Sequence, residues 1–290
     1  APGGRPRGGG ERQEQAPAPP VEAPELDARM VAAVATFVLC PDPGRGAFTA
    51  TYDAEPPVQE GFASVNAGSG RSLRLGGSGL NGQFARDLAG AGLQVDRFQR
   101  LHQDLLARAR ADPGRLVEGP CGQAGLLAAY GRVAREDGTG FVAIDVFPER
   151  HRPLHPANLA MVYCVGPDRR ECSGDEEFLA AIGELGESLA AACGGYSSGP
   201  ASQGAPPLRR VRVALVSGGK YSGRVPPDLV ATRLLRGLAA GAAPWASGDA
   251  VADAGPEFEL AFADGSFQRA LAALLPPGAG AVGAAGEKKK

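Results

Sequence analysis

Three nearly continuous apolar runs constrain the fold of this chain more than any other feature. They occupy residues 141–147, 159–165 and 211–216, and each has the length of one strand. Strands that are apolar along their whole length are buried on both faces, which is typical of parallel sheets covered by helices. A fourth run, at 61–66, ends on a polar residue ahead of a glycine-rich segment. We therefore predict an α/β fold.

Apolar residues recur with the helical period between these runs. Because the strands alternate with such segments, we predict a three-layer α/β/α sandwich with a mixed, mostly parallel sheet. A β-rich run at 47–52 adds a short strand, and residues 258–262 and 267–275 form a further strand and helix of this domain or the start of another. The helical faces are formed by Leu80, Phe84 and Leu88; by Phe98, Leu101 and Leu105; by Phe178, Ile182, Leu185 and Leu189; and by Val230, Leu234 and Leu238.

Glycine and proline concentrate at the two ends of the chain. Residues 1–24 contain almost no large apolar side chain, and residues 276–290 end in three lysines, so we expect two disordered tails. The folded domain then spans 25–275. Longer connections near 130–150 and the Gly/Ser/Pro-rich stretch 194–208 are expected as loop insertions.

Charge and hydropathy exclude several classes of protein. The net charge is −2, and the basic tails leave the body acidic, which argues against a nucleic-acid face except weakly through the tails. No apolar run approaches the ~18 residues of a membrane span, and the first 20 residues lack a secretory signal. The five cysteines form no C-x-x-C pair, so we expect reduced thiols, no metal or cofactor, and a cytoplasmic or nuclear location.

Two glycine-rich loops each follow a predicted strand and lead toward a helix. The first glycine loop, residues 75–82, reads LGGSGLNG, and the second, residues 217–223, reads SGGKYSG. Glycines let the backbone approach an anion closely, and a helix N-terminus favours negative charge. Tyr221 adds a flat surface for a sugar, and two such loops at one sheet edge suggest a diphosphate held between them.

Two other motifs resemble those of an ATPase and a hydrolase but lack features that these enzymes require. Residues 119–125 (GPCGQAG) lack the Lys-Ser/Thr pair of a phosphate-binding ATPase loop, so phosphoryl transfer is disfavoured. Residues 195–199 read GYSSG and match G-x-S-x-G, but a hydrolase elbow needs a buried strand before it, and here a helix precedes it.

Taken in order, five blocks of this sequence resemble the macro domain, the ADP-ribose-binding family. The resemblance covers residues 31–242 and implies an ADP-ribose cleft at the carboxyl end of the sheet. The blocks are VNA from Val65, GGSGLNG from Gly76, PCGQA from Pro120, VYCVGP from Val162 and SGGKY from Ser217, which are similar to V-N-A-A-N, G-G-G-G-V-D-G, P-T-G-E-A, V-I-H-x-V-G-P and S-T-G-V-Y.

By this resemblance, the ligand would be ADP-ribose or a mono-ADP-ribosylated protein. Either Asp53 or Glu55 would contact the adenine. The other residues expected to bind the ligand are Asn66, Gly77, Ser78, Gly79, Asn81, Ser217, Gly218, Gly219, Lys220 and Tyr221.

Two departures from the family pattern bear on catalysis. The second Asn of V-N-A-A-N is replaced by Ser69, and the Asp of V-D-G by Asn81. An amide cannot act as a general base, so we expect binding without catalysis, with Asn81 hydrogen-bonded to a ribose hydroxyl. We also expect Asn81→Asp to keep the fold, because the two side chains have the same shape. A weak ADP-ribosyl hydrolase and a macro fold that binds no ligand but interacts with proteins stay as alternatives.

Overall fold

The computed structural model describes nine segments of the chain. They are residues 26–40, 61–68, 73–77, 79–120, 124–148, 158–199, 206–246, 255–261 and 265–275. The predicted strand at 47–52, both predicted tails and the expected ligand contacts Asp53 and Ser78 lie outside these residues.

A mixed sheet forms the middle of the described fold and confirms the predicted α/β class. Its order is β1-β8-β7-β2-β6-β5-β4-β3, with eight strands among the described residues. The pairs from β1 through to β6 are parallel, and those from β6 to β3 are antiparallel. The strands are β1 (Val38–Leu39), β2 (Phe62–Gly68), β3 (Val117–Glu118), β4 (Ala128–Arg132), β5 (Val142–Val146), β6 (Asn158–Val165), β7 (Arg210–Ala214) and β8 (Glu257–Ala261).

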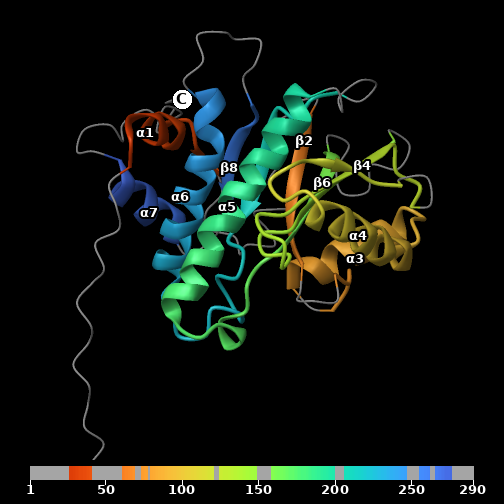
Figure 1. Ribbon diagram of the computed structural model, residues 1–290, viewed down its shortest axis with the longest axis horizontal. Helices are drawn as coiled ribbons and strands as arrows, with labels where there is room; N and C mark the ends of the chain where they lie inside the picture. Colours follow the sequence, from red (N-terminus) through yellow and green to blue (C-terminus); the bar gives the residue numbers. More distant parts are fainter. Residues whose placement is uncertain are drawn as a thin grey trace, which may run out of the picture.

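Helices cover the sheet from two sides and complete the three layers (Figure 1). On one side lie α1 (Ala28–Ala35), α5 (Asp175–Ser198), α6 (Pro227–Ala246) and α7 (Ser266–Leu274), whose apolar faces join the larger core. On the other side, α3 (Gly79–Gly90) and α4 (Val95–Arg110) build the smaller core. Alternate residues of one strand serve the two cores: Val162 belongs to the larger one, and Met161 and Tyr163 to the smaller one.

The two segments expected as loop insertions are more regular than the sequence indicated. The stretch near 130–150 contains most of β4 and all of β5, and α5 continues to Ser198 before it ends. The hydroxyls of Ser197 and Ser198 donate to the carbonyls of Cys193 and Gly194 one turn earlier, so these polar residues fit inside the helix. The G-x-S-x-G motif is therefore part of a helix rather than an elbow.

The last strand and helix belong to the same domain as the rest. β8 pairs with β7 over its full length and also with β1, so it lies inside the sheet. α7 contributes Phe267 and Ala270 to the larger core. This decides between the two possibilities that the sequence left open for residues 258–275.

Candidate functional site

Three connections leave the sheet at the same edge, which we call the carboxyl edge. β2 is parallel to both β6 and β7, and the registers pair Ala63 with Ala160 on one side and with Val211 on the other. The chain that follows each of these strands therefore begins at one end of the sheet. The first glycine loop follows β2 and includes the first turn of α3, the second glycine loop follows β7, and residues 166–174 follow β6.

The first glycine loop has left-handed backbone at three glycines where it enters α3. Gly76, Gly77 and Gly79 have φ of 138°, 85° and 77°, values that favour glycine over other residues. A side chain built on Gly76 or Gly77 would meet no atom within 4 Å, so this backbone faces open space. Gly79 is the first residue of α3, whose N-terminus thus lies directly behind the turn.

The two asparagines expected to bind a ligand are bonded to each other. Nδ2 of Asn66, in β2, donates to Oδ1 of Asn81, in α3, across 3.1 Å. Nδ2 of Asn81 donates to the carbonyls of Arg74 and Gly76 at 2.9 and 3.1 Å. Both side chains are buried, Asn66 fully and Asn81 at 4% exposure. Their amides therefore hold the first glycine loop against the end of β2.

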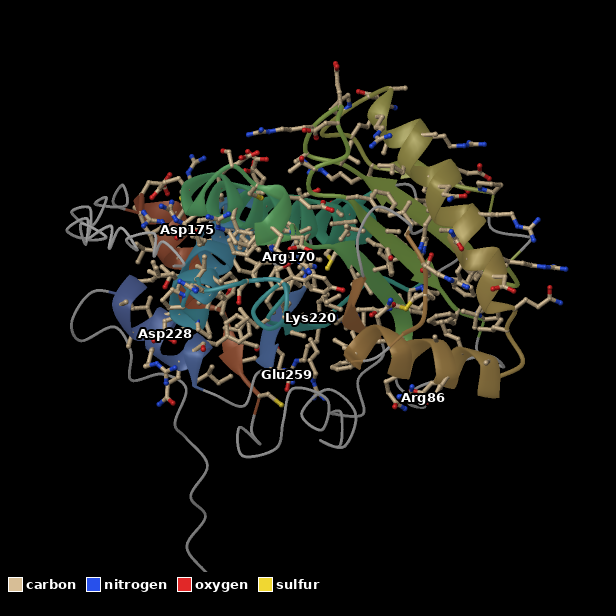
Figure 2. The ribbon with its side chains drawn as sticks, turned by 90° about the horizontal axis from the view of Figure 1, so that it is seen from below. Arg86, Arg170, Asp175, Lys220, Asp228 and Glu259 are labelled. Carbon is tan, nitrogen blue, oxygen red and sulfur yellow. The ribbon has the colours of Figure 1, made fainter. Side chains whose placement is uncertain are left out.

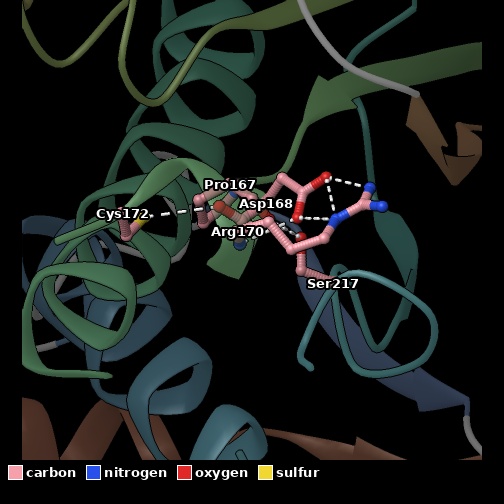
Figure 3. Close-up of polar contacts among 5 residues, drawn as sticks. All are labelled: Pro167, Asp168, Arg170, Cys172 and Ser217. Atoms are coloured by element: carbon pink, nitrogen blue, oxygen red, sulfur yellow. Dashed lines mark hydrogen bonds and ion pairs between the residues drawn. The ribbon is translucent and has the colours of Figure 1, made fainter. Parts of the chain in front are cut away.

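The second glycine loop is fixed at its start by Ser217. This residue has a φ of 57°, unusual for a residue other than glycine, and its Oγ donates to the carbonyl of Pro167 across 2.8 Å (Figure 3). Gly218 packs closely on Leu215, where a side chain would overlap the leucine. Gly219 differs, because a side chain there would meet nothing within 4 Å. The described part of this loop therefore presents open backbone at Gly219.

Residues 167–171 brace the second glycine loop. The backbone N–H of Arg169 donates to the carbonyl of Tyr221 across 2.9 Å. Asp168 accepts from the backbone N–H of Arg170 at 3.0 Å and from its Nε at 2.9 Å. The hydrogen bond from the Arg170 side chain holds the pKa of Asp168 below its ordinary value, and the charge of Lys220 acts in the same direction. Figure 2 shows Arg170 and Lys220 in this region, and both are exposed.

Sequence reasoning did not find the cavity beside this edge. It has a volume of about 660 Å³ and is lined from α4, from the turn before β5, from the end of β6 and from the start of α5. It shares Pro167, Asp168 and Glu171 with the segment that braces the second glycine loop, but contains none of the predicted ligand contacts. The residues come from segments far apart in the chain, so no local motif could have marked them.

A buried polar cluster lies in the smaller core, under α4. Nε2 of His102 and Oδ2 of Asp145 are 2.9 Å apart, and both side chains are fully buried. The imidazole stacks on Tyr163 with the ring centroids 4.3 Å apart. The second nitrogen of His102, Oδ1 of Asp145 and the Tyr163 hydroxyl have no hydrogen-bond partner within the described residues. This cluster was not predicted from the sequence.

Two other kinds of feature are absent from the parts of the chain that the structure describes. No helix there is both long and apolar enough to cross a bilayer. The same residues contain no group of three His, Cys, Asp or Glu side chains arranged to hold a metal ion.

Comparison with known proteins identifies a family and several relatives. The family model for the mitochondrial association factor 1 C-terminal domain matches residues 26–276. The chain is 31% identical over 214 residues to DNA/RNA-binding protein ALBA4 of Plasmodium yoelii yoelii, a match that covers 67% of this chain and 56% of that protein. It is 30% identical over 201 residues to mitochondrial association factor 1 form b0 of Toxoplasma gondii, covering 60% of this chain and 44% of that one. The chain thus spans about half the length of these curated relatives.

Among solved structures, a mutant macrodomain of Oceanobacillus iheyensis aligns with a TM-score of 0.43 and 18% identity. The alignment covers 74% of this chain and 86% of the macrodomain. A likeness at this level carries no argument about function.

Proposed function

The chain belongs to the family of the mitochondrial association factor 1 C-terminal domain, and within that fold we propose that it binds ADP-ribose or a mono-ADP-ribosylated protein at the carboxyl edge. The proposal rests on one observation above others. Gly77 and Gly219, in separate glycine loops at the same edge, both leave the space beside their backbone open. Such backbone can approach a diphosphate as closely as N–H···O hydrogen bonds require.

The charge around the second glycine loop supports an anionic ligand. Lys220 and Arg224 are both exposed there. The helix that follows the first glycine loop adds the positive end of its dipole. We propose that the diphosphate lies between these groups without a divalent metal, and that Tyr221 packs against a ribose.

We propose that Asn81 serves the site indirectly rather than through a hydrogen bond to a ribose hydroxyl. Its Nδ2 already donates to two carbonyls and its Oδ1 already accepts from Asn66. We propose that Asn81 acts on the ligand through the shape of the first glycine loop, and that backbone N–H groups contact the distal ribose. A neutral amide in this position favours binding over hydrolysis.

A cytoplasmic or nuclear location is part of the proposal. The described cysteines Cys40, Cys164, Cys172 and Cys193 are free thiols, as a reducing compartment favours. One relative is named for mitochondrial association, and on that name we propose a partner at that organelle for this chain as well.

Titration calorimetry with ADP-ribose tests the proposal. In buffer with a chelator we expect a Kd in the micromolar range, about −8 kcal/mol. Gly219→Glu adds bulk and negative charge beside the diphosphate and should weaken binding at least ~100-fold. Gly90→Glu is the matched control, because Gly90 at the end of α3 is equally open, and this variant should bind like the wild type.

Three results would overturn the proposal. They are the absence of heat at millimolar ADP-ribose, a requirement for a divalent metal, and unchanged affinity in folded Gly219→Glu. A single-stranded RNA oligonucleotide serves as a competitor, because ALBA4 relatives are named as DNA/RNA-binding proteins. If the RNA binds more tightly than ADP-ribose and Gly219→Glu leaves the affinity for RNA unchanged, the chain binds nucleic acid on another surface.

A further inference from the structure

The buried cluster of His102, Asp145 and Tyr163 reaches the carboxyl edge through its tyrosine. The register pairs Tyr163 of β6 with Asn66 of β2, so the two side chains leave the sheet on the same face. The end of the ring lies further along β2, beside Gly68. A Cβ built on Gly68 would fall 2.2 Å from Cζ of Tyr163 and 2.3 Å from its hydroxyl oxygen. Tyr163 therefore leans across the sheet from β6 to the last residue of β2.

The contact between Tyr163 and Gly68 requires glycine for a reason of space alone. The φ of Gly68 is not positive, so its backbone conformation is open to other residues. The overlap with the ring is what excludes a side chain, because any Cβ would have to displace the tyrosine or bend the end of β2. The ring thus limits the place at which the chain can leave β2.

The tyrosine ring is itself held in place by two other elements. The imidazole of His102, in α4, stacks on the ring at an interplanar angle of 28°. Nε2 of His102 lies 2.9 Å from Oδ2 of Asp145, in β5, and all three side chains are fully buried. Rotation of the Tyr163 ring would break this stack inside a close-packed core. The position of its hydroxyl end is therefore set by α4 and β5 as well as by β6.

Core packing does not explain why this residue is a tyrosine. Its hydroxyl is buried without a hydrogen-bond partner among the described residues, a cost that phenylalanine would avoid. Burial raises the pKa of the Tyr163 phenol, so the hydroxyl stays protonated and neutral. Tyr196, in the larger core, differs in that its hydroxyl donates to the carbonyl of Pro206 across 3.3 Å. What the Tyr163 hydroxyl has in place of a hydrogen bond is the close contact with Gly68.

We propose that Tyr163 is a positioning residue for the carboxyl edge, and that its hydroxyl end fixes the point at which the chain leaves β2 for the first glycine loop. Asn66 and Gly68 lie two residues apart on one face of β2 and are held by different partners, Asn66 by Asn81 and Gly68 by Tyr163. With both contacts in place, the loop keeps one arrangement, and a ligand has little ordering left to impose. The effect on affinity rests on the proposed binding of ADP-ribose, whereas the effect on the loop does not.

Hydrogen exchange and titration calorimetry on the full chain test this proposal with Tyr163→Phe, which removes the hydroxyl and keeps the ring. Amides of the first glycine loop should exchange at least ~10-fold faster, and the Kd for ADP-ribose should rise at least ~3-fold, because a smaller fraction of the protein holds the loop ready. The melting temperature should not fall, since no described residue is hydrogen-bonded to the hydroxyl that is lost. A purely structural role predicts the opposite, a lower melting temperature with an unchanged loop.

Tyr196→Phe is the matched control. It removes a hydroxyl from an equally buried tyrosine, but from one whose hydroxyl is hydrogen-bonded. Loss of that bond should lower the melting temperature by about 2–4 °C. Exchange in the first glycine loop and the affinity for ADP-ribose should stay as in the wild type. Opposite responses of the two variants separate positioning of the loop from stability of the core.

A double-mutant cycle tests the contact with Gly68 directly. Gly68→Ala places a methyl group against the ring, and Tyr163→Leu shortens the side chain and makes room for it. The loss of melting temperature in Gly68→Ala/Tyr163→Leu should therefore be smaller than the sum of the two single losses. Additive losses would show that the two residues do not constrain each other.

Failure of this inference can be told from failure of the proposed function. Unchanged loop exchange in folded Tyr163→Phe overturns the inference, and so does faster exchange with an unchanged affinity for ADP-ribose. If the wild type binds no ADP-ribose but Tyr163→Phe still speeds up exchange in the loop, the proposed function fails and the positioning role of Tyr163 holds.

Discussion

Asn66 and Asn81 are joined by a 3.1 Å hydrogen bond that ties the end of β2 to the first turn of α3. Asn81 then donates to two backbone carbonyls. One belongs to Arg74, just before the first glycine loop, and the other to Gly76, inside it. Each amide hydrogen of Asn81 has an acceptor. The role of these two residues in ligand binding stays a prediction, but their role in shaping the loop is visible in the hydrogen bonds.

Asn81→Asp should destabilise the protein, although the sequence alone suggested that it would be tolerated. A carboxylate cannot donate to the two carbonyls and would face their negative ends in a buried position. We expect a loss of at least ~2 kcal/mol in the free energy of unfolding at pH 7, measured by urea denaturation. Because this environment raises the pKa of the new carboxyl, the loss should shrink as the pH falls toward 4.

Gln103→Glu is the matched control, because it makes the same amide-to-acid change at an exposed position of α4. It should change stability by less than ~0.5 kcal/mol. Equal stability of Asn81→Asp and the wild type at pH 7 would show that the amide does not hold the loop.

The contact between α5 and α6 depends on glycine at a particular position. A side chain on Gly237 would overlap the backbone carbonyl of Gly183 in the facing helix. Gly237→Ala should therefore cost about 1–3 kcal/mol through separation of the helices, measured by thermal or urea denaturation. Gly183→Ala meets its nearest atom, the carbonyl oxygen of Arg233, only at 3.9 Å, and should be neutral or stabilising by up to ~1 kcal/mol. If the two variants lose equal stability, helix separation is not the cause.

Two ion pairs on β7 and β8 differ in burial and should differ in energy. Arg212 and Glu259 are paired at 3.2 Å through two hydrogen bonds, with side chains 1% and 3% exposed. Glu259→Gln removes the negative charge beside the buried guanidinium and should cost about 3 kcal/mol in unfolding free energy. Glu257→Gln, two residues away in the same strand, breaks the half-buried pair with Arg210 and should cost less than ~1 kcal/mol. Similar losses in urea denaturation would contradict the effect of burial.

The Asp168–Arg170 contact makes a small contribution that depends on pH. Since the pKa of Asp168 is lowered in the folded protein, its stabilisation is present above the ordinary carboxyl pKa and is lost as the pH falls through the lower folded value. Asp168→Asn should therefore melt slightly below the wild type from pH 5 to 8, by at most ~3 °C, because Arg170 is largely exposed. The difference should close below about pH 3.9. A melting difference that does not shrink as the pH falls below about 3.9 would assign the effect to the backbone contact of Asp168 instead.

Much of the fold could be predicted because its signals are local. The apolar runs became β5, β6 and β7, and the helical faces of Phe84 and of Ile182 became α3 and α5. Strand pairing is different, since it joins residues far apart in the chain. The sequence did not indicate that β4 and β5 extend the sheet in antiparallel order. The connection between them, residues 133–141, is longer than the two-residue turn that would identify a β-hairpin from sequence.

The sequence by itself determined the alternation of strands and helices, the places of the two glycine loops and the shared edge at which they must lie. These features follow from periodicity, from glycine and from the rule that parallel strands end together. Only the tertiary structure decided what the side chains contact. It engaged Asn81 with backbone carbonyls, paired Arg212 with Glu259 inside the fold, and assembled an acidic cavity from α4, β6 and α5. Burial and partner choice depend on residues brought together across the whole chain, and no local pattern contains that information.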